Sequence, residues 1–215
     1  MRMRRLAALF VGATLVISAA ACGGGDDPTT PGTPGGPDTV NVGVIPIVDV
    51  APIFLGETKG FFAEENIDLN LDTAAGGAAI LPGVDGGTFH FGFSNAPSVL
   101  IAQTNGLDIK AIAPGNGTAG DPDNDFSGLV VKDDSITRPA DLAGKKVAAN
   151  TQGGIVELAI RELVDRDGGD PNSLEIVAIG FPDMVAALEN DQVDAIFAVE
   201  PTLSAAKAKG WQVLG

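Results

Sequence analysis

The stretch GVDGGTFHFGFSNAP at residues 83–97 and the stretch ALENDQVDAIFAVEP at residues 187–201 follow one pattern. Aligned without a gap, each predicts the end of a helix, a short polar turn, a hydrophobic strand, and a polar residue before a proline. Pro97 and Pro201 suit the first turn of a following helix, where a missing N–H costs nothing. Because ligands of α/β proteins bind beyond the carboxyl ends of parallel strands, two such units predict two similar lobes with a site between them. Few aligned positions are identical, so chance similarity of two βα units is the alternative.

Strand and helix patterns alternate outward from these two units. Residues 40–44 and 67–72 place apolar side chains at every second position, which predicts strands, whereas residues 154–164 have helical spacing. Such alternation predicts mostly parallel sheets covered by helices on both faces. The other expected strands are 89–93, 109–113, 129–132, 146–149, 174–179 and 193–199, and the other expected helices are 51–60, 74–84, 97–105, 139–143, 182–190 and 201–209.

The first residues predict export. Arg2, Arg4 and Arg5 precede a short apolar run, and small residues then lead to Cys22, the one cysteine of the chain. A basic start, a short apolar core and small residues describe a secretory signal peptide, and the run is short for a membrane span. The small residues that end in cysteine resemble a bacterial lipobox, which implies a lipid on Cys22 and a location on the extracytoplasmic face of the cell membrane. An ordinary signal with an unrelated cysteine is the alternative.

Charge and residue types restrict the partners and the chemistry. Without the three signal arginines, 10 basic residues face 28 acidic ones, a net charge of −18. Such a surface disfavours nucleic acid and anionic membrane. One histidine and one cysteine cannot form a usual zinc site, and no setting for Ser–His catalysis is recognisable. We therefore expect no catalysis, no metal and no cofactor.

An acidic run at Asp121, Asp123 and Asp125 alternates as in a calcium-binding loop. However, Phe126 stands where that loop needs glycine, and Lys132 stands where it needs a bidentate glutamate. We therefore interpret the run as a solvated loop.

Three collinear segments carry a family resemblance: ETKGFFAEENIDL at 57–69, DSITRPADLAGKKVA at 134–148, and ALENDQVDAIFAVEP at 187–201. Together they resemble solute-binding proteins of ABC importers, specifically the nitrate/sulfonate/taurine and thiamine-precursor (NMT1/THI5-like) binding group, over about residues 40–205. The resemblance implies an α/β, periplasmic-binding-protein type 2 fold with two lobes, parallel-rich sheets and a ligand held between the lobes. It also implies a lipoprotein, monomeric when full length, that captures a small polar organic or anionic solute for an ABC permease and, indirectly, its ATPase.

The first residues, the composition of the stretch after Cys22 and the resemblance together predict a division of the chain. We expect a signal peptide at 1–21, a flexible tether at 22–38, the first half of lobe 1 at 39–128, lobe 2 with hinge strands at both ends at 129–199, and the start of the return to lobe 1 at 200–215. Family members continue beyond the return and complete lobe 1. The C-terminal part of lobe 1 is therefore expected to be missing, as in a fragment or a truncated gene product.

His90 departs from the family, which usually has aspartate at this place, as the second copy does at Asp194. We expect a neutral, hydrogen-bonded His90 to tie its turn to the backbone as aspartate would. A functional histidine is the alternative.

Candidate ligand contacts follow the expected strand ends. In residues 150–154 small side chains leave N–H groups bare at a helix N-terminus, which favours an anion. These loops contain no arginine for a bidentate clamp, so Asp49, Asp183 and Glu200 could instead receive an amine or a heterocycle N–H. Helix N-capping is the alternative role of Asn150 and Thr151. The expected contacts are Ile47, Asp49, Ser94, Asn95, Asn116, Thr151, Gln152, Gly153 and Glu200.

Two other functions remain open from the sequence. One is a sensory or interaction lipoprotein, or a truncated paralogue without a transport function. The other is an enzyme on the same fold, similar to pyrimidine-precursor synthases, although the export signal and the single histidine count against it. The sequence does not define the ligand.

Overall fold

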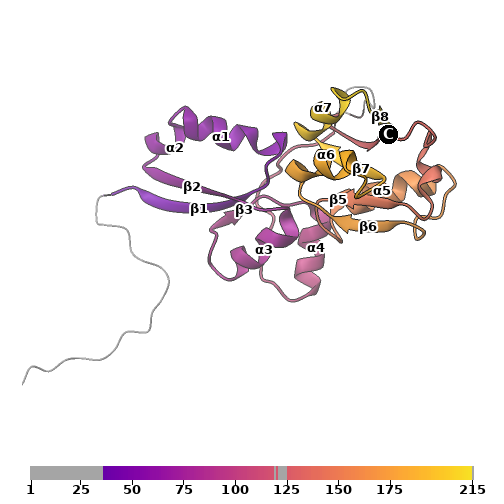
Figure 1. Cartoon of the computed structure of the whole chain (residues 1–215). Helices are drawn as coiled ribbons and strands as arrows, with labels where there is room; N and C mark the ends of the chain where they lie inside the picture. Colours follow the sequence, from indigo (N-terminus) through magenta and orange to yellow (C-terminus); the bar gives the residue numbers. More distant parts are fainter. Residues whose placement is uncertain (1–35, 119, 121–124, 215) are drawn as a thin grey trace, which may run out of the picture. The chain divides into compact units, whose positions relative to one another are not determined.

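Figure 1 shows the computed structural model of the chain, which describes residues 36–118, 120 and 125–214. The expected signal peptide, Cys22, and the expected tether as far as residue 35 lie outside the described residues. The described chain contains a three-stranded sheet followed by a five-stranded sheet.

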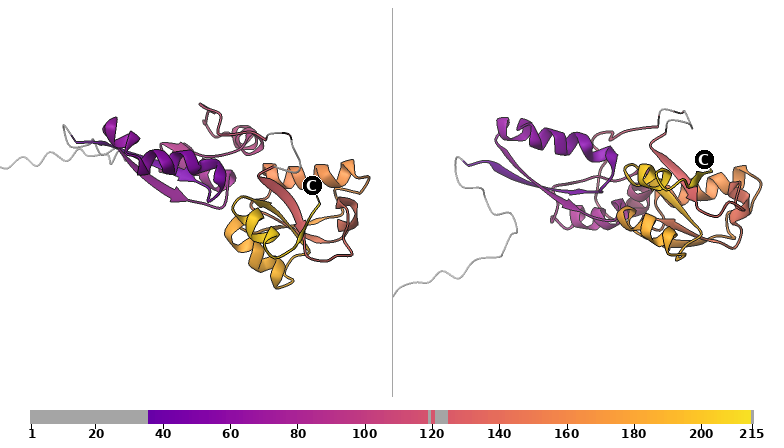
Figure 2. Two further views of the ribbon diagram at one scale, coloured as in Figure 1. Left: turned by 90° about the horizontal axis from the view of Figure 1, so that it is seen from above. Right: turned by 45° about the horizontal axis from the view of Figure 1, so that its top comes forward.

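The first sheet has the strand order β2-β1-β3, and all its pairs are parallel. The crossover from β1 to β2 and the crossover from β2 to β3 run in opposite directions across the sheet, and α1 and α2 cover one face while α3 and α4 lie on the other, as Figures 1 and 2 show. In chain order the elements are β1 (Asp38–Val44), η1 (Val48–Val50), α1 (Ala51–Thr58), α2 (Phe61–Glu64), β2 (Ile67–Thr73), α3 (Gly77–Asp85), β3 (Phe91–Gly92) and α4 (Ala96–Thr104).

The second sheet has the order β6-β5-β7-β4-β8 and is mixed. β5, β6 and β7 are parallel, whereas β4 runs antiparallel to both β7 and β8. α5 lies on one face, and α6 and α7 lie on the other (Figure 2). In chain order the elements are β4 (Ser127–Val131), η2 (Pro139–Leu142), β5 (Lys146–Ala149), α5 (Ile155–Arg166), β6 (Glu175–Ala178), α6 (Phe181–Glu189), β7 (Ala195–Val199), α7 (Thr202–Lys207) and β8 (Gln212–Val213).

The secondary structure confirms most of the predicted elements and corrects one strand. Residues 109–113, expected as a strand, form none. The neighbouring β3 pairs over only Phe91 and Gly92, so it offers little ladder for another strand to extend. Instead Ile109 is buried, and its carbonyl accepts a hydrogen bond from Gln103 Nε2 at 2.9 Å, which holds the segment against the end of α4.

The range 200–215, expected as the start of the return to lobe 1, packs against the second sheet where it is described. α7 contacts β7 and β4, and β8 pairs with β4 through Val130 and Val131. The free edge of β4 accepts β8 because β7 occupies only the other edge. The lobe boundaries themselves stay a prediction.

The turns that precede β3 and β7 are built alike. The His90 N–H donates to the Asn41 carbonyl, and His90 Nδ1 accepts the Asn41 N–H, both at 2.9 Å. The Asp194 N–H donates to the Lys146 carbonyl, and Asp194 Oδ2 accepts the Lys146 N–H, both at 2.8 Å. His90 thus ties its turn to the backbone as Asp194 does, which confirms the expected structural role.

Candidate functional site

The loop after β1 holds two of the expected contacts. Ile47 is the N-cap of η1, and the next residue, Val48, donates its N–H to the Glu200 carbonyl at 2.8 Å. Asp49 Oδ1 accepts a hydrogen bond from Asn116 Nδ2. Asp49 Oδ2 is buried and has no hydrogen-bond partner among the described residues. A buried carboxylate oxygen without a partner is costly, so this atom can accept a donor from a solute or from water.

The two expected contacts in the loop after β3, Ser94 and Asn95, have different bonding. Asn95 is the N-cap of α4, and its Oδ1 accepts the Ser98 N–H at 3.0 Å. Helix N-termini favour asparagine because its side-chain oxygen satisfies an otherwise free N–H. Ser94, in contrast, has a buried hydroxyl oxygen without a hydrogen-bond partner among the described residues. Gly77 lies against it so closely that a Cβ there would be 2.1 Å from Ser94 Oγ.

The loop after β5 presents a second free hydroxyl. Thr151 Oγ1 is buried without a hydrogen-bond partner in the part of the chain described. Its neighbour Asn150 is 7% exposed and donates from Nδ2 to the Ala75 carbonyl at 2.9 Å. Asn150 therefore acts in a contact between two loops rather than as the cap of α5, whose N-cap is Gly154.

Ser98 completes this group. It is only 4% exposed, and its hydroxyl oxygen also lacks a partner within the described residues. A Cβ on Gly154 would lie 2.8 Å from Thr151 Oγ1 and 3.7 Å from Ser98 Oγ, so Gly154 brings the two hydroxyls together. A Cβ on Gly76 would lie 2.8 Å from Thr151 Cγ2. We call Ser94, Ser98, Thr151, Gly76, Gly77 and Gly154 the hydroxyl seat.

Three helices begin at the hydroxyl seat. The N-caps are Gly76 for α3, Asn95 for α4 and Gly154 for α5, and each helix has nine or more residues. Helix N-termini carry free N–H groups and a partial positive charge, so they favour negative charge nearby. Hydroxyls that lack a protein acceptor can donate to the same anion. The seat itself contains no charged side chain, so its electrostatic preference comes from the backbone.

Gln152 and Gly153 lie beside the seat. Gly153 adopts φ +69°, which glycine reaches without the steric cost of a Cβ, and it donates its N–H to Glu157 Oε2 at 2.9 Å. Burial raises the pKa of Glu157, but hydrogen bonds from Gly153 and Arg161 outweigh burial and hold the pKa below its usual value. Gln152 Nε2 lies 3.4 Å from the Ile176 carbonyl. With Ser98, Gln152 and Gly153 line a pocket of about 200 Å³.

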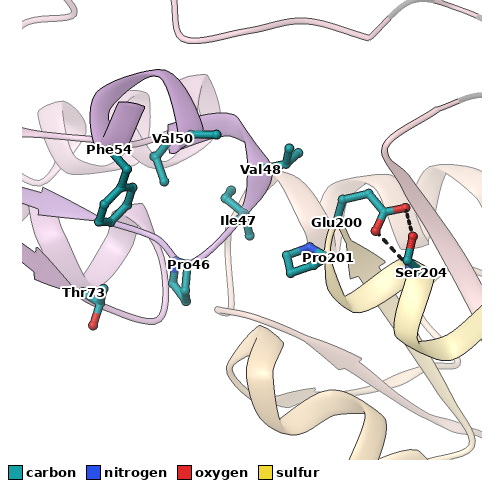
Figure 3. Close-up of a pocket in the computed structure, with 10 residues that line it drawn as sticks. Pro46, Ile47, Val48, Val50, Phe54, Thr73, Glu200, Pro201 and Ser204 are labelled. Atoms are coloured by element: carbon teal, nitrogen blue, oxygen red, sulfur yellow. Dashed lines mark hydrogen bonds between the residues drawn. The ribbon is translucent and has the colours of Figure 1, made fainter. Parts of the chain in front are cut away.

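Glu200 is engaged within its own turn. Its carboxylate accepts the Ser204 N–H and the Ser204 hydroxyl, both at 2.9 Å. Figure 3 shows this carboxylate pointing toward α7. The expected role of Glu200 as a receptor for an amine thus competes with its binding of the first turn of α7.

A larger pocket of about 640 Å³ lies beside Glu200. Figure 3 shows its apolar wall from the loop after β1 and α1, facing Pro201. Its lining residues are Pro46, Ile47, Val48, Val50, Ala51, Phe54, Thr73, Glu200, Pro201 and Ser204. This wall offers contacts for apolar atoms and few polar partners.

The structure thus distributes the expected residues over separate places. Ser94 and Thr151 lie in the hydroxyl seat, Ile47 and Glu200 in the larger pocket, and Gln152 and Gly153 in the smaller pocket, while Asp49 pairs with Asn116 and Asn95 caps a helix. Sequence reasoning missed Ser98, Gly76 and Gly77. The Gly76–Gly77 pair follows the end of β2, so the strand-end rule used elsewhere could have found it.

Metal binding finds little support in the described part of the chain. Among the residues described, no three His, Cys, Asp or Glu side chains are grouped to hold a metal ion. The acidic run is described only at Asp125, because residues 121–124 lie outside the described residues.

Comparison with known proteins gives the family. The profile described as NMT1/THI5 like matches residues 47–213. The chain belongs to this family. Its α/β architecture is the periplasmic-binding-protein fold, as expected from the resemblance. No curated protein matches the chain.

Several solved structures share the fold of this family member. The alkanesulfonate-binding protein SsuA from Xanthomonas axonopodis pv. citri bound to MOPS has a TM-score of 0.68 and 20% identity, with 84% of this chain and 61% of that chain covered. The nitrate-binding protein NrtA from Synechocystis PCC 6803 has a TM-score of 0.69 and 19% identity, covering 83% and 51%. The aliphatic sulphonate-binding protein SsuA from Escherichia coli has a TM-score of 0.61 and 21% identity, covering 83% and 60%. The chain thus spans between 51% and 61% of the length of these three proteins.

These three proteins are named as binding proteins for alkanesulfonate, nitrate and aliphatic sulphonate. None of the helices within the described residues has the length and apolar character needed to cross a membrane.

Proposed function

We propose that the chain is the solute-binding component of an ABC importer and that it holds a small solute with an oxyanion group at the hydroxyl seat. The observation that carries the proposal is the set of three buried hydroxyl oxygens, on Ser94, Ser98 and Thr151, that lack partners among the described residues. Buried polar groups are normally hydrogen-bonded, and three free ones beside three helix N-termini favour an anionic ligand. The family and the sulfonate- and nitrate-binding proteins that share its fold support the same class of solute.

Binding needs no arginine in this proposal. Backbone N–H groups and hydroxyls together can supply several hydrogen bonds to one oxyanion, and each bond to a charged group contributes about 1.5–3 kcal/mol.

Isothermal titration calorimetry with nitrate, sulfate and MOPS as separate probes tests the proposal. We expect at least one probe to bind, and we expect the double variant Ser94→Ala/Thr151→Val to weaken its binding about tenfold or more, because two contacts are lost. The thermal midpoint should change little, since neither hydroxyl bonds a described protein group.

Ser173→Ala serves as the matched control. This variant also loses a hydroxyl, but the Ser173 hydroxyl donates to the Asp170 carbonyl at 2.7 Å, in the turn before β6. The control should keep the parent affinity. If no probe binds, or if the double variant binds with the parent affinity, the hydroxyl seat is not an oxyanion site.

The same proposal places the protein on the extracytoplasmic face of the membrane, held by a lipid on Cys22 and serving a permease. The support is the run of small residues before the one cysteine of the chain. We expect Cys22→Ser to move the protein from the membrane fraction to the soluble fraction. If the variant stays in the membrane fraction, the lipid anchor on Cys22 is contradicted, whereas the proposed solute binding is unaffected.

A further inference from the structure

The two equivalent turns differ in the chemistry of one acceptor. In the second sheet the Lys146 N–H meets a carboxylate oxygen of Asp194, whereas in the first sheet the Asn41 N–H meets His90 Nδ1. A carboxylate accepts hydrogen bonds throughout the neutral and mildly acidic range. An imidazole nitrogen accepts only while it carries no proton, and a protonated imidazole has two donors and no acceptor.

This hydrogen bond lies beside the short pairing between β1 and β3. Asn41 lies in the centre of β1, its carbonyl accepts the His90 N–H, and its Oδ1 accepts a hydrogen bond from Asn70 Nδ2 of β2 at 3.1 Å. β3 pairs with β1 over only two residues, Phe91 and Gly92, directly after His90. On the far side of this pair the Phe93 N–H donates to the Gly43 carbonyl at 2.8 Å, so the imidazole bond is the side-chain part of a short attachment of β3 to β1.

The charges on the surrounding elements are all of one sign. β1 carries Asp38, β2 carries Asp68 and Asp72, α3 carries Asp85, and β3 and α4 carry no charged residue. His90 is exposed, so its ring can turn and a proton can reach it.

We propose that His90 is an acid-sensitive latch: when the imidazole takes up a proton, it releases the Asn41 N–H and loosens the start of β3, while the Asp194 turn stays closed. Histidine is the side chain whose ordinary titration range, about pH 5 to 8, includes mildly acidic surroundings. The latch lies outside the hydroxyl seat, so this inference does not depend on which solute the protein binds.

Amide hydrogen exchange of the ¹⁵N-labelled chain, followed by NMR between about pH 7.5 and pH 5, tests the latch. Each rate is divided by the intrinsic rate at the same pH, and the ring nitrogen signals report the protonation of His90. We expect the protection of the Asn41 amide to fall about three- to tenfold as the imidazole protonates, because one net hydrogen bond is lost. The Lys146 amide, held by Asp194, should keep its protection and is the internal control.

The variant His90→Asp should keep the Asn41 protection constant over the same range. His90→Asn, which offers an uncharged oxygen that does not titrate, serves the same purpose if the aspartate variant does not fold. Constant Asn41 protection in the parent while the imidazole titrates would overturn the proposal. So would an equal fall at Asn41 and Lys146, or a fall that persists in the folded variant.

Discussion

The two sheets are built from the same strand–turn–helix unit, yet they bury their strands to different degrees. In the second sheet every residue of β7 is buried, and β4 is buried except at its first residue. In the first sheet β2 alternates between half-buried and exposed positions along most of its length. Strands covered on both faces are apolar throughout, while a strand with one covered face alternates. One local pattern therefore occurs in two environments, and the neighbouring elements determine how deeply its strand is buried.

The cores follow the same division. The largest buried cluster centres on the second sheet, whereas β1 contributes Val42 and Val44 to a small separate cluster with Val50. The second sheet should therefore tolerate truncation of its side chains less well than the first.

The largest expected effect on the free energy of unfolding comes from replacing a leucine by alanine, and the same substitution can be made in both sheets. Leu129 in β4 is fully buried, and Leu71 in β2 is half-buried. Leu129→Ala should lower the free energy of unfolding by about 2–5 kcal/mol, and Leu71→Ala by less than about 2 kcal/mol, because the cost grows with the cavity left behind. Urea unfolding followed by circular dichroism measures both. Equal losses would show that the two sheets are equally well packed.

The next effect compares the two turns. Asp194→Ala should cost about 1.5 kcal/mol or more, since its carboxylate bonds the Lys146 N–H and lies 3.6 Å from Lys145 Nζ. His90→Ala should cost about 0.5–1.5 kcal/mol at neutral pH, because the lost bond has a neutral acceptor. The same unfolding measurement, made at pH 7.5, gives both values. A larger loss for His90 would reverse the proposed ranking.

A smaller effect concerns the helices that begin at the hydroxyl seat. Asn95→Ala should cost about 1 kcal/mol, because Oδ1 no longer caps α4 at the Ser98 N–H. Thr151→Ala before α5 should cost less, since no described group bonds its hydroxyl. Thermal unfolding distinguishes the two. An Asn95 variant as stable as the parent would argue that the cap contributes little and that the side chain is available to a ligand.

The smallest effect is an acid dependence specific to the second sheet. Hydrogen bonds from Arg138 and from the Ala140 N–H hold the pKa of Asp167 below its ordinary value of 3.8. A carboxylate with a lowered folded-state pKa adds stability that is fully present above the unfolded value and is lost as the pH falls through the lowered one. Asp167→Asn should therefore be less stable than the parent at neutral pH, and the difference should shrink below about pH 4. Urea midpoints measured between about pH 7 and pH 2.5 test this. A difference that stays constant would assign the effect to packing.

The class of fold and the edge of each sheet that carries the candidate contacts could be predicted from local sequence patterns. Apolar periodicity reports which faces are buried, and the alternation of strands and helices then favours mostly parallel sheets. Parallel strands end at one edge, so the positions of Ser94 and Thr151 after their strands were enough to select them as candidate contacts. The role of His90 was also predictable, since the aligned Asp194 marked the position of a backbone tie.

The hydrogen-bond partner of each of these side chains depends on how segments that are distant in the sequence pack together. Asn95 and Thr151 look alike as polar residues at strand ends, but the Asn95 oxygen caps a helix while the Thr151 hydroxyl stays free of partners among the described residues. Ser98 became part of the seat because Gly154, far away in the sequence, lies against it. Residues 109–113 have the pattern of a strand but form none, because the short β3 offers little ladder for another strand to extend. Local pattern encodes burial, whereas a hydrogen-bond partner depends on the approach of distant segments, which no local pattern contains.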